Sequence, residues 1–415
     1  MLTNEARVKP LQNLYNYNNL TVNVKRCEIM ENKAEINFKE EFGTEIEKNE
    51  KLYSDEVDVD MTCGIDGTEK KKEADALLKV QDISLSFTQY TSGLKRTELN
   101  VISNLSIEVR SGEILAVVGS SGSGKSLLAH AILGILPSNA TLKGKIKYDG
   151  HELTQSKKEK LRGKEIALIP QSINYLDPLM RISDQVIGDI DEEDKKLMKN
   201  LQRKIFQRYD LKPEVDRMLP HELSGGMARR VLVSTALMSS ANLIIADEPT
   251  PGLDEKTLSE TLNYFKDMAD NGCAVILITH DIEAALKISD KIAVFYAGTV
   301  LEVANVEDFN SAGENLRHPY TRALWNALPQ NGFHTIHGHQ PMQDEIIEGC
   351  VFYERCSRRN DLCSTSTPPL KEINGGMVRC NTTTTKEESF NKTPVFYDAK
   401  GDVIIKEVKG CNGAP

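Results

Sequence analysis

From residue 77 onward, short apolar runs alternate with segments of helical periodicity. Strands are predicted at 78–87, 101–109, 114–118, 166–169, 243–246, 275–279 and 292–294, and helices at 127–136, 228–238 and 258–269. Strands that alternate with helices build a mostly parallel sheet covered on both faces, so the pattern predicts an α/β core. We place this core at residues 77–330.

The flanking segments lack sustained periodicity. Residues 1–76 are rich in Asn, with more acids than bases, and are predicted to be a largely disordered acidic extension. Residues 331–381 are polar and contain a cluster of cysteines, so they are predicted to be a small Cys-rich C-terminal extension. In the tail, 382–415, the apolar stretch 403–405 is expected either to form an edge strand or to remain loose.

Composition narrows the class of protein. The chain has 415 residues, 40% of them hydrophobic and 27% charged, which is typical of a soluble globular protein with a core. A net charge of −10 argues against nucleic-acid binding through a bulk basic field, and no nucleic-acid partner is expected. No apolar run approaches the roughly 18 residues that span a bilayer, and none suits a secretory signal. We therefore expect a cytosolic location, with docking onto a membrane partner left open.

The strongest motif directly follows the apolar run 114–118 and precedes a predicted helix. It fits the phosphate-loop pattern G-x-x-x-x-G-K-[ST] with Gly119, Ser120, Ser121, Gly122, Ser123, Gly124, Lys125 and Ser126. The glycines let backbone N–H groups surround phosphate oxygens, and the helix N-terminus favours an anion. Lys125 is expected to reach the β- and γ-phosphates of ATP, and the Ser126 hydroxyl to ligate Mg²⁺.

A second apolar run, 243–246, ends in two acids. Asp247 is placed to hold Mg²⁺, and Glu248 to orient and polarise the attacking water. Phosphoryl transfer needs mainly such positioning and charge stabilisation. Together with the phosphate loop, these acids predict a nucleoside triphosphatase.

The segment Leu223-Ser224-Gly225-Gly226-Met227 resembles the signature motif of ABC ATPases. It precedes a predicted helix, where Ser224, Gly225 and Gly226 can bind a γ-phosphate at the helix N-terminus. The resemblance covers roughly residues 77–330. It implies a P-loop NTPase fold of the ABC type with a helical signature subdomain, and an ATP sandwiched between the phosphate loop of one subunit and the signature motif of a second.

The resemblance assigns further residues by their order and spacing. Gln171 resembles the Q-loop glutamine, which contacts Mg²⁺ or water and senses the membrane subunit. His280 resembles the switch histidine that contacts the γ-phosphate, and Asp254 resembles the D-loop aspartate at the dimer seam. Phe87 stands where the family has an aromatic that stacks on adenine, with Tyr90 as the alternative.

Some positions indicate a branch of this family. Met227 replaces the usual Gln, as in oligopeptide, dipeptide and nickel importers, while Pro251-Gly252 replaces the usual Ser-Ala before Asp254. The segment 318–324 resembles one that closes the ATPase domain in those importers. The stretch 167–179 is closer to nickel or metal-chelate importers, so both peptides and nickel chelates are expected cargo classes.

Four of the eight cysteines lie close together with the spacing C-x5-C-x6-C-x16-C, at Cys350, Cys356, Cys363 and Cys380. This segment resembles the C-terminal extension of the same importers, some of which carry a [4Fe–4S] cluster. Four thiolates can bind such a cluster or one Zn²⁺, and they can also remain free thiols.

The resemblance implies an ATP- and Mg²⁺-dependent subunit of an importer at the cytoplasmic face of the membrane. Its expected partners are a second ATPase subunit, two membrane permease subunits and an extracytoplasmic solute-binding protein. The alternatives are a soluble ABC ATPase that is not coupled to transport, a non-hydrolysing interaction protein, and an exporter. Intact Lys125, Asp247, Glu248 and His280 argue against the non-hydrolysing protein.

Overall fold

The computed structural model describes residues 76–90, 96–188, 192–239, 241–310, 313–341 and 349–383, together with two short strands at 396–397 and 403–404. The expectation for the acidic extension lies almost wholly outside the described residues. In the tail, β13 (Phe396–Tyr397) pairs antiparallel with β14 (Val403–Ile404), so the predicted apolar stretch contributes a short strand. Among the described residues, no helix has the length and apolar character to cross a membrane.

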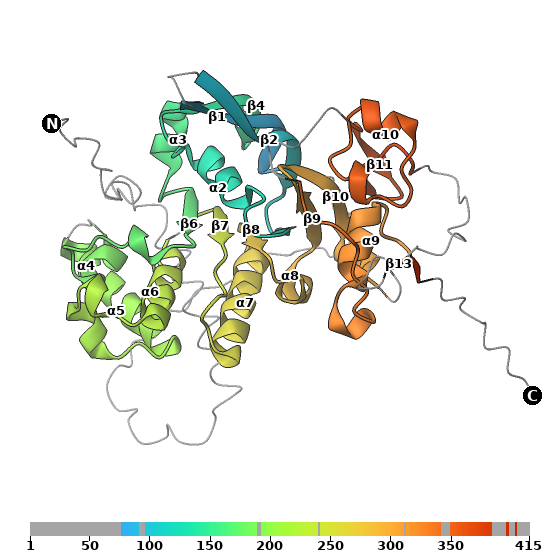
Figure 1. Cartoon of the computed structure of the whole chain (residues 1–415). Coiled ribbons are helices and arrows are strands. Elements are labelled where there is room, and N and C mark those ends of the chain that lie inside the picture. The colour runs from blue at the N-terminus through green and yellow to red at the C-terminus, as the bar shows by residue number, and fades with distance from the viewer. Residues whose placement is uncertain are drawn as a thin grey trace, which may run out of the picture. The chain divides into compact units, whose positions relative to one another are not determined.

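An eight-stranded sheet forms the centre of the fold (Figure 1). Its order is β11-β12-β10-β9-β3-β8-β7-β6. The strands are β3 (Ile114–Val118), β6 (Ile166–Ile169), β7 (Leu243–Asp247), β8 (Ala274–Thr279), β9 (Lys291–Tyr296), β10 (Thr299–Asn305), β11 (Leu370–Ile373) and β12 (Gly376–Arg379). The five strands from β9 to β6 run parallel, as predicted, and β10, β12 and β11 add to one side in antiparallel pairs.

Helices cover the sheet because successive side chains of each strand point to opposite faces. In β3, Leu115 and Val117 join the hydrophobic cluster that contains α2 (Lys125–Leu133). Ala116 and Val118 join another cluster that contains α8 (Ile282–Ile288). The phosphate loop therefore follows a strand that is fixed from both faces.

A second sheet was not predicted. It is antiparallel, has the order β2-β1-β4-β5, and consists of β1 (Leu78–Tyr90), β2 (Arg96–Val109), β4 (Ala140–Tyr148) and β5 (His151–Glu152). The first two predicted strands thus lie outside the parallel sheet. β4 was missed because one face of it is exposed and its sequence, ATLKGKIKY, alternates with lysines.

Helices fill the chain between β6 and β7 and lie together at one side of Figure 1. They are α4 (Ile182–Ile187), α5 (Glu192–Arg208) and α6 (Gly225–Leu237). The 3-10 turns η3 (Ile173–Tyr175), η4 (Pro213–Arg217) and η5 (Pro220–Glu222) connect them. This is the predicted helical signature subdomain. The remaining helices of the core are α3 (Gln155–Leu161) and α7 (Glu255–Asp270).

The predicted Cys-rich extension shares the central sheet. After η6 (Val306–Asp308), α9 (Pro319–Asn326) and η7 (Pro329–Asn331), the chain forms η8 (Tyr353–Arg355) and α10 (Asp361–Thr365) before β11 and β12. The buried Arg317 connects this part to β10. Its guanidinium donates to the buried Glu302 carboxylate at 3.3 Å and to the Asp308 carboxylate at 2.8 Å. It also donates to the Ile373 carbonyl oxygen at 2.6 Å.

Candidate nucleotide site

The phosphate loop has the backbone that an anion requires. A Cβ at Gly119 would lie 2.4 Å from the Phe295 carbonyl oxygen, so only glycine fits where β3 passes β9. Gly124 caps α2 at a φ of 102°, a conformation that favours glycine, and no side chain caps the helix. The first N–H groups of α2 are therefore left for a ligand such as phosphate.

Lys125 is buried beneath this loop. Its Nζ donates to the carbonyl oxygens of Gly119 and Ser120, each at 2.8 Å. Burial lowers the pKa of the Lys125 ammonium, while Glu248 and Asp247 act in the opposite direction. The positive charge is thus held by weak acceptors that a phosphate can replace.

Asp247, the last residue of β7, lies beside Ser126. Asp247 is only 3% exposed, and its Oδ1 has no hydrogen-bond partner within the described part of the chain. Burial raises the pKa of this carboxyl, and a hydrogen bond with the Ser126 side chain lowers it. A buried carboxylate oxygen without a partner is costly, and a divalent cation would satisfy it. Ser126 and Asp247 therefore fit a Mg²⁺ site.

Glu248 and His280 are also in contact, since His280 Nδ1 lies 2.6 Å from Glu248 Oε2. Glu248 follows β7 with a φ of 50°, in the left-handed region, and its N–H donates to the Ile278 carbonyl oxygen at 2.8 Å. The Arg229 guanidinium donates to the Glu248 carbonyl oxygen at 2.9 Å. The ends of β7 and β8 thus place an acid and a histidine beside the phosphate loop.

The signature residues lie at the N-terminus of α6. Ser224 is the N-cap, and its hydroxyl accepts a hydrogen bond from the Met227 N–H at 3.2 Å. Because Met227 uses only its backbone here, the departure from Gln leaves the cap intact. Ser224 and Gly225 are exposed, and a Cβ at Gly226 would lie 3.7 Å from the Gly252 carbonyl oxygen. Signature motif and D-loop are therefore neighbours.

Asp254 caps α7, accepting from the Thr257 N–H at 3.0 Å and from its hydroxyl at 2.8 Å. These bonds lower the pKa of the exposed Asp254 carboxyl. The Pro-Gly departure provides a glycine at 252, where φ is 79°.

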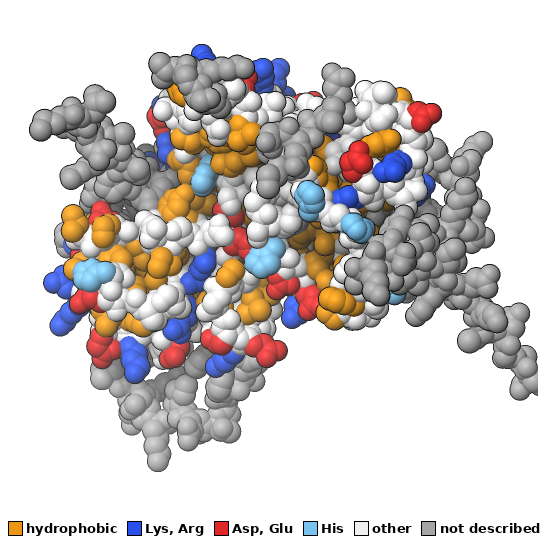
Figure 2. Space-filling view, in the orientation of Figure 1, with side chains coloured by type: hydrophobic (Ala, Val, Ile, Leu, Met, Phe, Trp, Pro, Cys, Tyr) orange, Lys and Arg blue, Asp and Glu red, His pale blue; other side chains and the backbone are white. Residues whose placement is uncertain are grey.

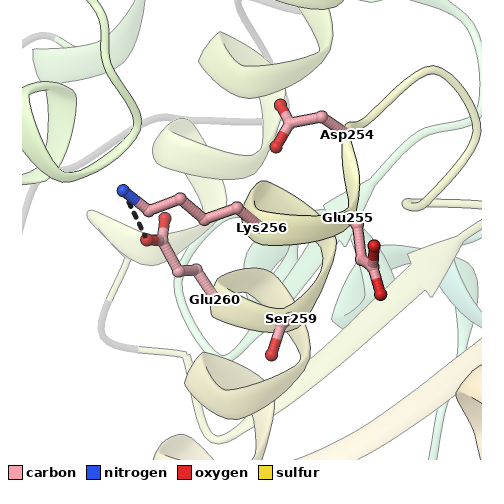
Figure 3. Close-up of a pocket in the computed structure, with 5 residues that line it drawn as sticks. All are labelled: Asp254, Glu255, Lys256, Ser259 and Glu260. Carbon is pink, nitrogen blue, oxygen red and sulfur yellow. Dashed lines mark ion pairs between the residues drawn. The ribbon is translucent and has the colours of Figure 1, made fainter.

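An open hollow beside the D-loop is lined by Asp254, Glu255, Lys256, Ser259 and Glu260, with Lys256 directed toward Glu260 (Figure 3). Because three of these side chains are carboxylates, the hollow does not suit a triphosphate.

Two other expected residues belong to β1 and to the loop after β6. Gln171 is exposed at the start of the loop after β6. Phe87 is partly buried in β1 and packs against the main core, whereas Tyr90 is exposed. Both stay predictions.

Two polar residues at the site, Arg229 and Gln340, were not predicted. Arg229 contacts Glu248, and Gln340 accepts a hydrogen bond from the Ser120 hydroxyl at 2.5 Å. For Arg229, the only local sequence signal was the pair Arg229-Arg230 that follows the signature motif. Gln340 had none.

The four cysteines gather in the C-terminal part. Burial, joined by a smaller effect of nearby thiols, Cys380 and Cys363 among them, raises the pKa of the Cys350 and Cys356 thiols to about 11. However, Cys363 Sγ lies 3.1 Å from Asn360 Oδ1, and Cys380 Sγ lies 3.2 Å from Thr382 Oγ1. Within the described ranges, no three His, Cys, Asp or Glu side chains are arranged to hold a metal ion. The thiols as they stand do not fit a metal.

A parallel sheet, a glycine-rich loop before α2, and the paired Ser126 and Asp247 define a P-loop nucleoside triphosphatase. Comparison with known proteins narrows this class. Residues 102–251 match the model of the ABC transporter family, and residues 301–363 match that of the oligopeptide/dipeptide transporter C-terminal region.

Several known proteins are similar to this chain over most of their own length. The oligopeptide transport ATP-binding protein OppD of Escherichia coli (strain K12) is 33% identical over 329 residues, which are 74% of this chain and 94% of that protein. AppD of Bacillus subtilis (strain 168) is 31% identical, with 73% and 96% covered. The dipeptide transport protein DppD of Haemophilus influenzae is 29% identical, with 74% and 96% covered. The chain belongs to the ABC transporter family as an ATP-binding subunit, and it is an ATPase.

Proposed function

We propose that this chain hydrolyses ATP to power an importer of peptides. The observation that carries the proposal is the meeting of Ser126, Asp247, Glu248 and His280 at the phosphate loop. Matching relatives are named for oligopeptide or dipeptide transport, which supports peptides as the cargo class. Nickel or metal chelates are the alternative cargo, supported only by the sequence of 167–179.

Each residue of the cluster has a chemical role in this proposal. Lys125 exchanges the Gly119 and Ser120 carbonyls for the β- and γ-phosphates of ATP. Ser126 and Asp247 hold Mg²⁺, which when bound neutralises charge on the phosphate oxygens. Glu248 orients the attacking water, and His280 holds the Glu248 carboxylate in place while contacting the γ-phosphate. Gln171 adds a ligand from the Q-loop, and Phe87 stacks on adenine.

The site is completed by a second ATPase subunit. Ser224 and Gly225 are exposed and Gly226 is half-buried at the N-terminus of α6, where a helix of thirteen residues favours an anion. In the proposed dimer they bind the γ-phosphate held by the partner's phosphate loop. Asp254 lies at the seam between the subunits.

Coupling to two permease subunits takes place through the loop after β6. Leu179 is 90% exposed and Ile173 is 42% exposed, and both lie a few residues after Gln171. Figure 2 shows further hydrophobic side chains at the surface over the region of α4–α6. Such exposed apolar groups support a docking surface for a membrane partner. The chain would then sit peripherally at the cytoplasmic face, with a solute-binding protein delivering cargo outside.

Metal binding by the four cysteines of the C-terminal part is a separate hypothesis. A [4Fe–4S] cluster or Zn²⁺ would require the sulfurs of Cys363 and Cys380 to leave their present neighbours, Asn360 and Thr382. Anaerobic purification, an absorption spectrum and metal analysis test occupancy. Four free thiols in the anaerobically purified protein would contradict the hypothesis.

The ATPase assignment is tested with two variants. Glu248→Gln should retain ATP, reduce turnover by several orders of magnitude and accumulate as a closed dimer, because the water is no longer oriented. Lys125→Ala should lose ATP binding. Equilibrium binding, phosphate release and size-exclusion chromatography with ATP measure these outcomes. Near-normal turnover of Glu248→Gln would contradict the role of Glu248.

Transport coupling needs its own experiment, since a soluble ABC ATPase would pass the first. The chain is reconstituted with candidate permease subunits and their solute-binding protein in liposomes. Peptide-dependent stimulation of ATPase activity, lost on replacing Leu179 by Asp, would support the importer. ATPase activity that does not change when permeases, peptides or nickel chelates are added would favour the soluble enzyme.

A further inference from the structure

One hydrogen bond joins the phosphate loop to the C-terminal part of the chain. The Ser120 hydroxyl donates to Gln340 Oε1 at 2.5 Å, although the two residues are 220 positions apart. Gln340 is half-buried and lies in the segment 333–341, after η7. A side chain from outside the ATPase motifs thus contacts the second residue of the phosphate loop.

This segment is held in place by Arg355 of η8. The Arg355 Nε donates to the His337 carbonyl oxygen at 3.2 Å. Gly338 has a φ of 84°, a conformation that favours glycine, and a Cβ there would lie 3.4 Å from Arg355 Cγ, in ordinary van der Waals contact. Arg355 therefore fixes the backbone three residues before Gln340.

Arg355 is itself anchored on an aromatic cluster. Its guanidinium faces the rings of Tyr296 and Phe352, each with its centroid 5.9 Å away, and donates to the Tyr296 hydroxyl at 3.3 Å. Tyr296 and Phe352 pack edge to face with centroids 5.5 Å apart. Such contacts restrict a long side chain that would otherwise be mobile.

The same cluster reaches the phosphate loop by a second route. Tyr296 ends β9, and the preceding residue, Phe295, presents its carbonyl oxygen to Gly119. The aromatic cluster is thus connected to Ser120 in two ways, through β9 and Gly119 and through Gln340. Its carbonyl oxygen accepts from Lys125 Nζ at 2.8 Å and from the Ser123 hydroxyl at 2.7 Å.

We propose that Gln340 is a positioning residue of the nucleotide site, through which the C-terminal part of the chain contributes to ATP affinity. The Gln340 amide holds Ser120 so that the loop keeps the shape that receives a triphosphate. Without this bond the loop must be ordered by ATP itself, and that ordering weakens binding. The inference rests on the proposed ATP site.

The first test compares Gln340→Met, which keeps the length of the side chain but lacks the acceptor, with Gln207→Met on the exposed surface of α5 as the control. The full-length Gln340→Met protein should bind ATP about two- to tenfold more weakly, the range of one neutral hydrogen bond. The KM for ATP should rise equally, with kcat unchanged at saturation. Unaltered affinity, or a fall in kcat alone, would overturn the proposal.

A double-mutant cycle identifies the partner. Ser120→Ala should weaken ATP binding, and adding Gln340→Met should weaken it no further, because each change removes the same bond. Additive losses would show that Gln340 acts elsewhere. Gln340→Glu gives a second readout: it keeps an acceptor but adds a negative charge near the triphosphate, so its weaker binding should recover toward wild type at high salt. Weakening that salt does not relieve would contradict the placement.

The two ideas fail differently. If wild-type protein does not bind ATP, or Lys125→Ala binds it normally, the proposed function fails. If wild type binds, Lys125→Ala does not, and Gln340→Met matches wild type, only the role of Gln340 fails. Amide exchange adds a test, since linkage requires ATP to slow exchange in 333–341 in wild type and less so in Gln340→Met. Exchange there that ATP leaves unchanged in wild type would oppose the proposal.

Discussion

Arg229 donates a hydrogen bond to the carbonyl oxygen of Glu248 over 2.9 Å, and so joins the signature helix to the end of β7. Glu248 has a φ of 50°, which for a residue with a side chain costs on the order of 1–3 kcal/mol. The hydrogen bonds made by its carbonyl and its N–H offset that cost. They hold the Glu248 carboxylate toward His280.

Arg229 should therefore affect turnover more than binding. Arg229→Met is expected to lower kcat by about tenfold or more, since a hydrogen bond from a charged donor contributes roughly 1.5–3 kcal/mol. The ATP dissociation constant should change little, and Arg229→Lys should recover part of the rate. Steady-state kinetics with separate equilibrium binding checks this. A variant that turns over normally would show that Glu248 needs no support from α6.

Asp247 should control the Mg²⁺ requirement. Asp247→Asn removes the buried charge with little change in shape, so half-maximal ATPase activity should need at least about tenfold more Mg²⁺. Titration of Mg²⁺ at fixed ATP measures the shift, with exposed Asp270→Asn as the control. An unchanged Mg²⁺ dependence would remove Asp247 from the metal site.

The ion pair of Arg317 and Glu302 should be important for stability. Arg317→Met leaves the Glu302 carboxylate buried without its counter-charge, and breaking such a pair costs about 3–5 kcal/mol of unfolding free energy. The double variant with Glu302→Gln should regain much of this. Denaturant unfolding measures both. Arg359→Met, which breaks an exposed pair with Glu354, should cost below about 1 kcal/mol.

His318 should make stability depend on pH. Burial lowers the pKa of the His318 imidazole to about 3, while in the unfolded chain it is near 6.5. The unfolded state therefore binds a proton first, and stability falls as pH drops below about 6.5, by up to about 1.4 kcal/mol per pH unit. His318→Asn keeps an acceptor for the Tyr320 N–H but does not titrate. Its unfolding free energy, compared with wild type between pH 7 and 5, should lack this slope.

The central strands and the phosphate loop were predictable because both are local patterns. The run 114–118 is apolar throughout, and the structure has β3 at the same residues, buried on both faces. The end of α2 was placed too late, since Gly134 adopts a left-handed C-cap and ends the helix at Leu133. Asp247 and Glu248 could be assigned because they end an apolar run and lie downstream of the phosphate loop.

What the sequence did not predict are contacts between distant residues. Nothing local marks Gln340 as a partner of Ser120, or Arg317 as the partner of Glu302, since each pair forms only when the chain has folded. The strands β11 and β12 are four residues each and carry polar side chains, so no apolar alternation indicated them. For the four cysteines, the spacing suggested a ligand set or free thiols, and in the part of the chain that the structure describes no three such side chains are arranged to hold a metal ion.

The pairing of β12 with β10, where Glu302 lies opposite Val378, has a practical consequence. A shortened protein that stops near residue 330 would lose the last two strands of its main sheet and bare a row of N–H and C=O groups along β10. Bare strand borders tend to recruit other chains. A shortened form for crystallisation or fusion should therefore retain β11 and β12, since these strands protect the edge of β10 from pairing with other chains.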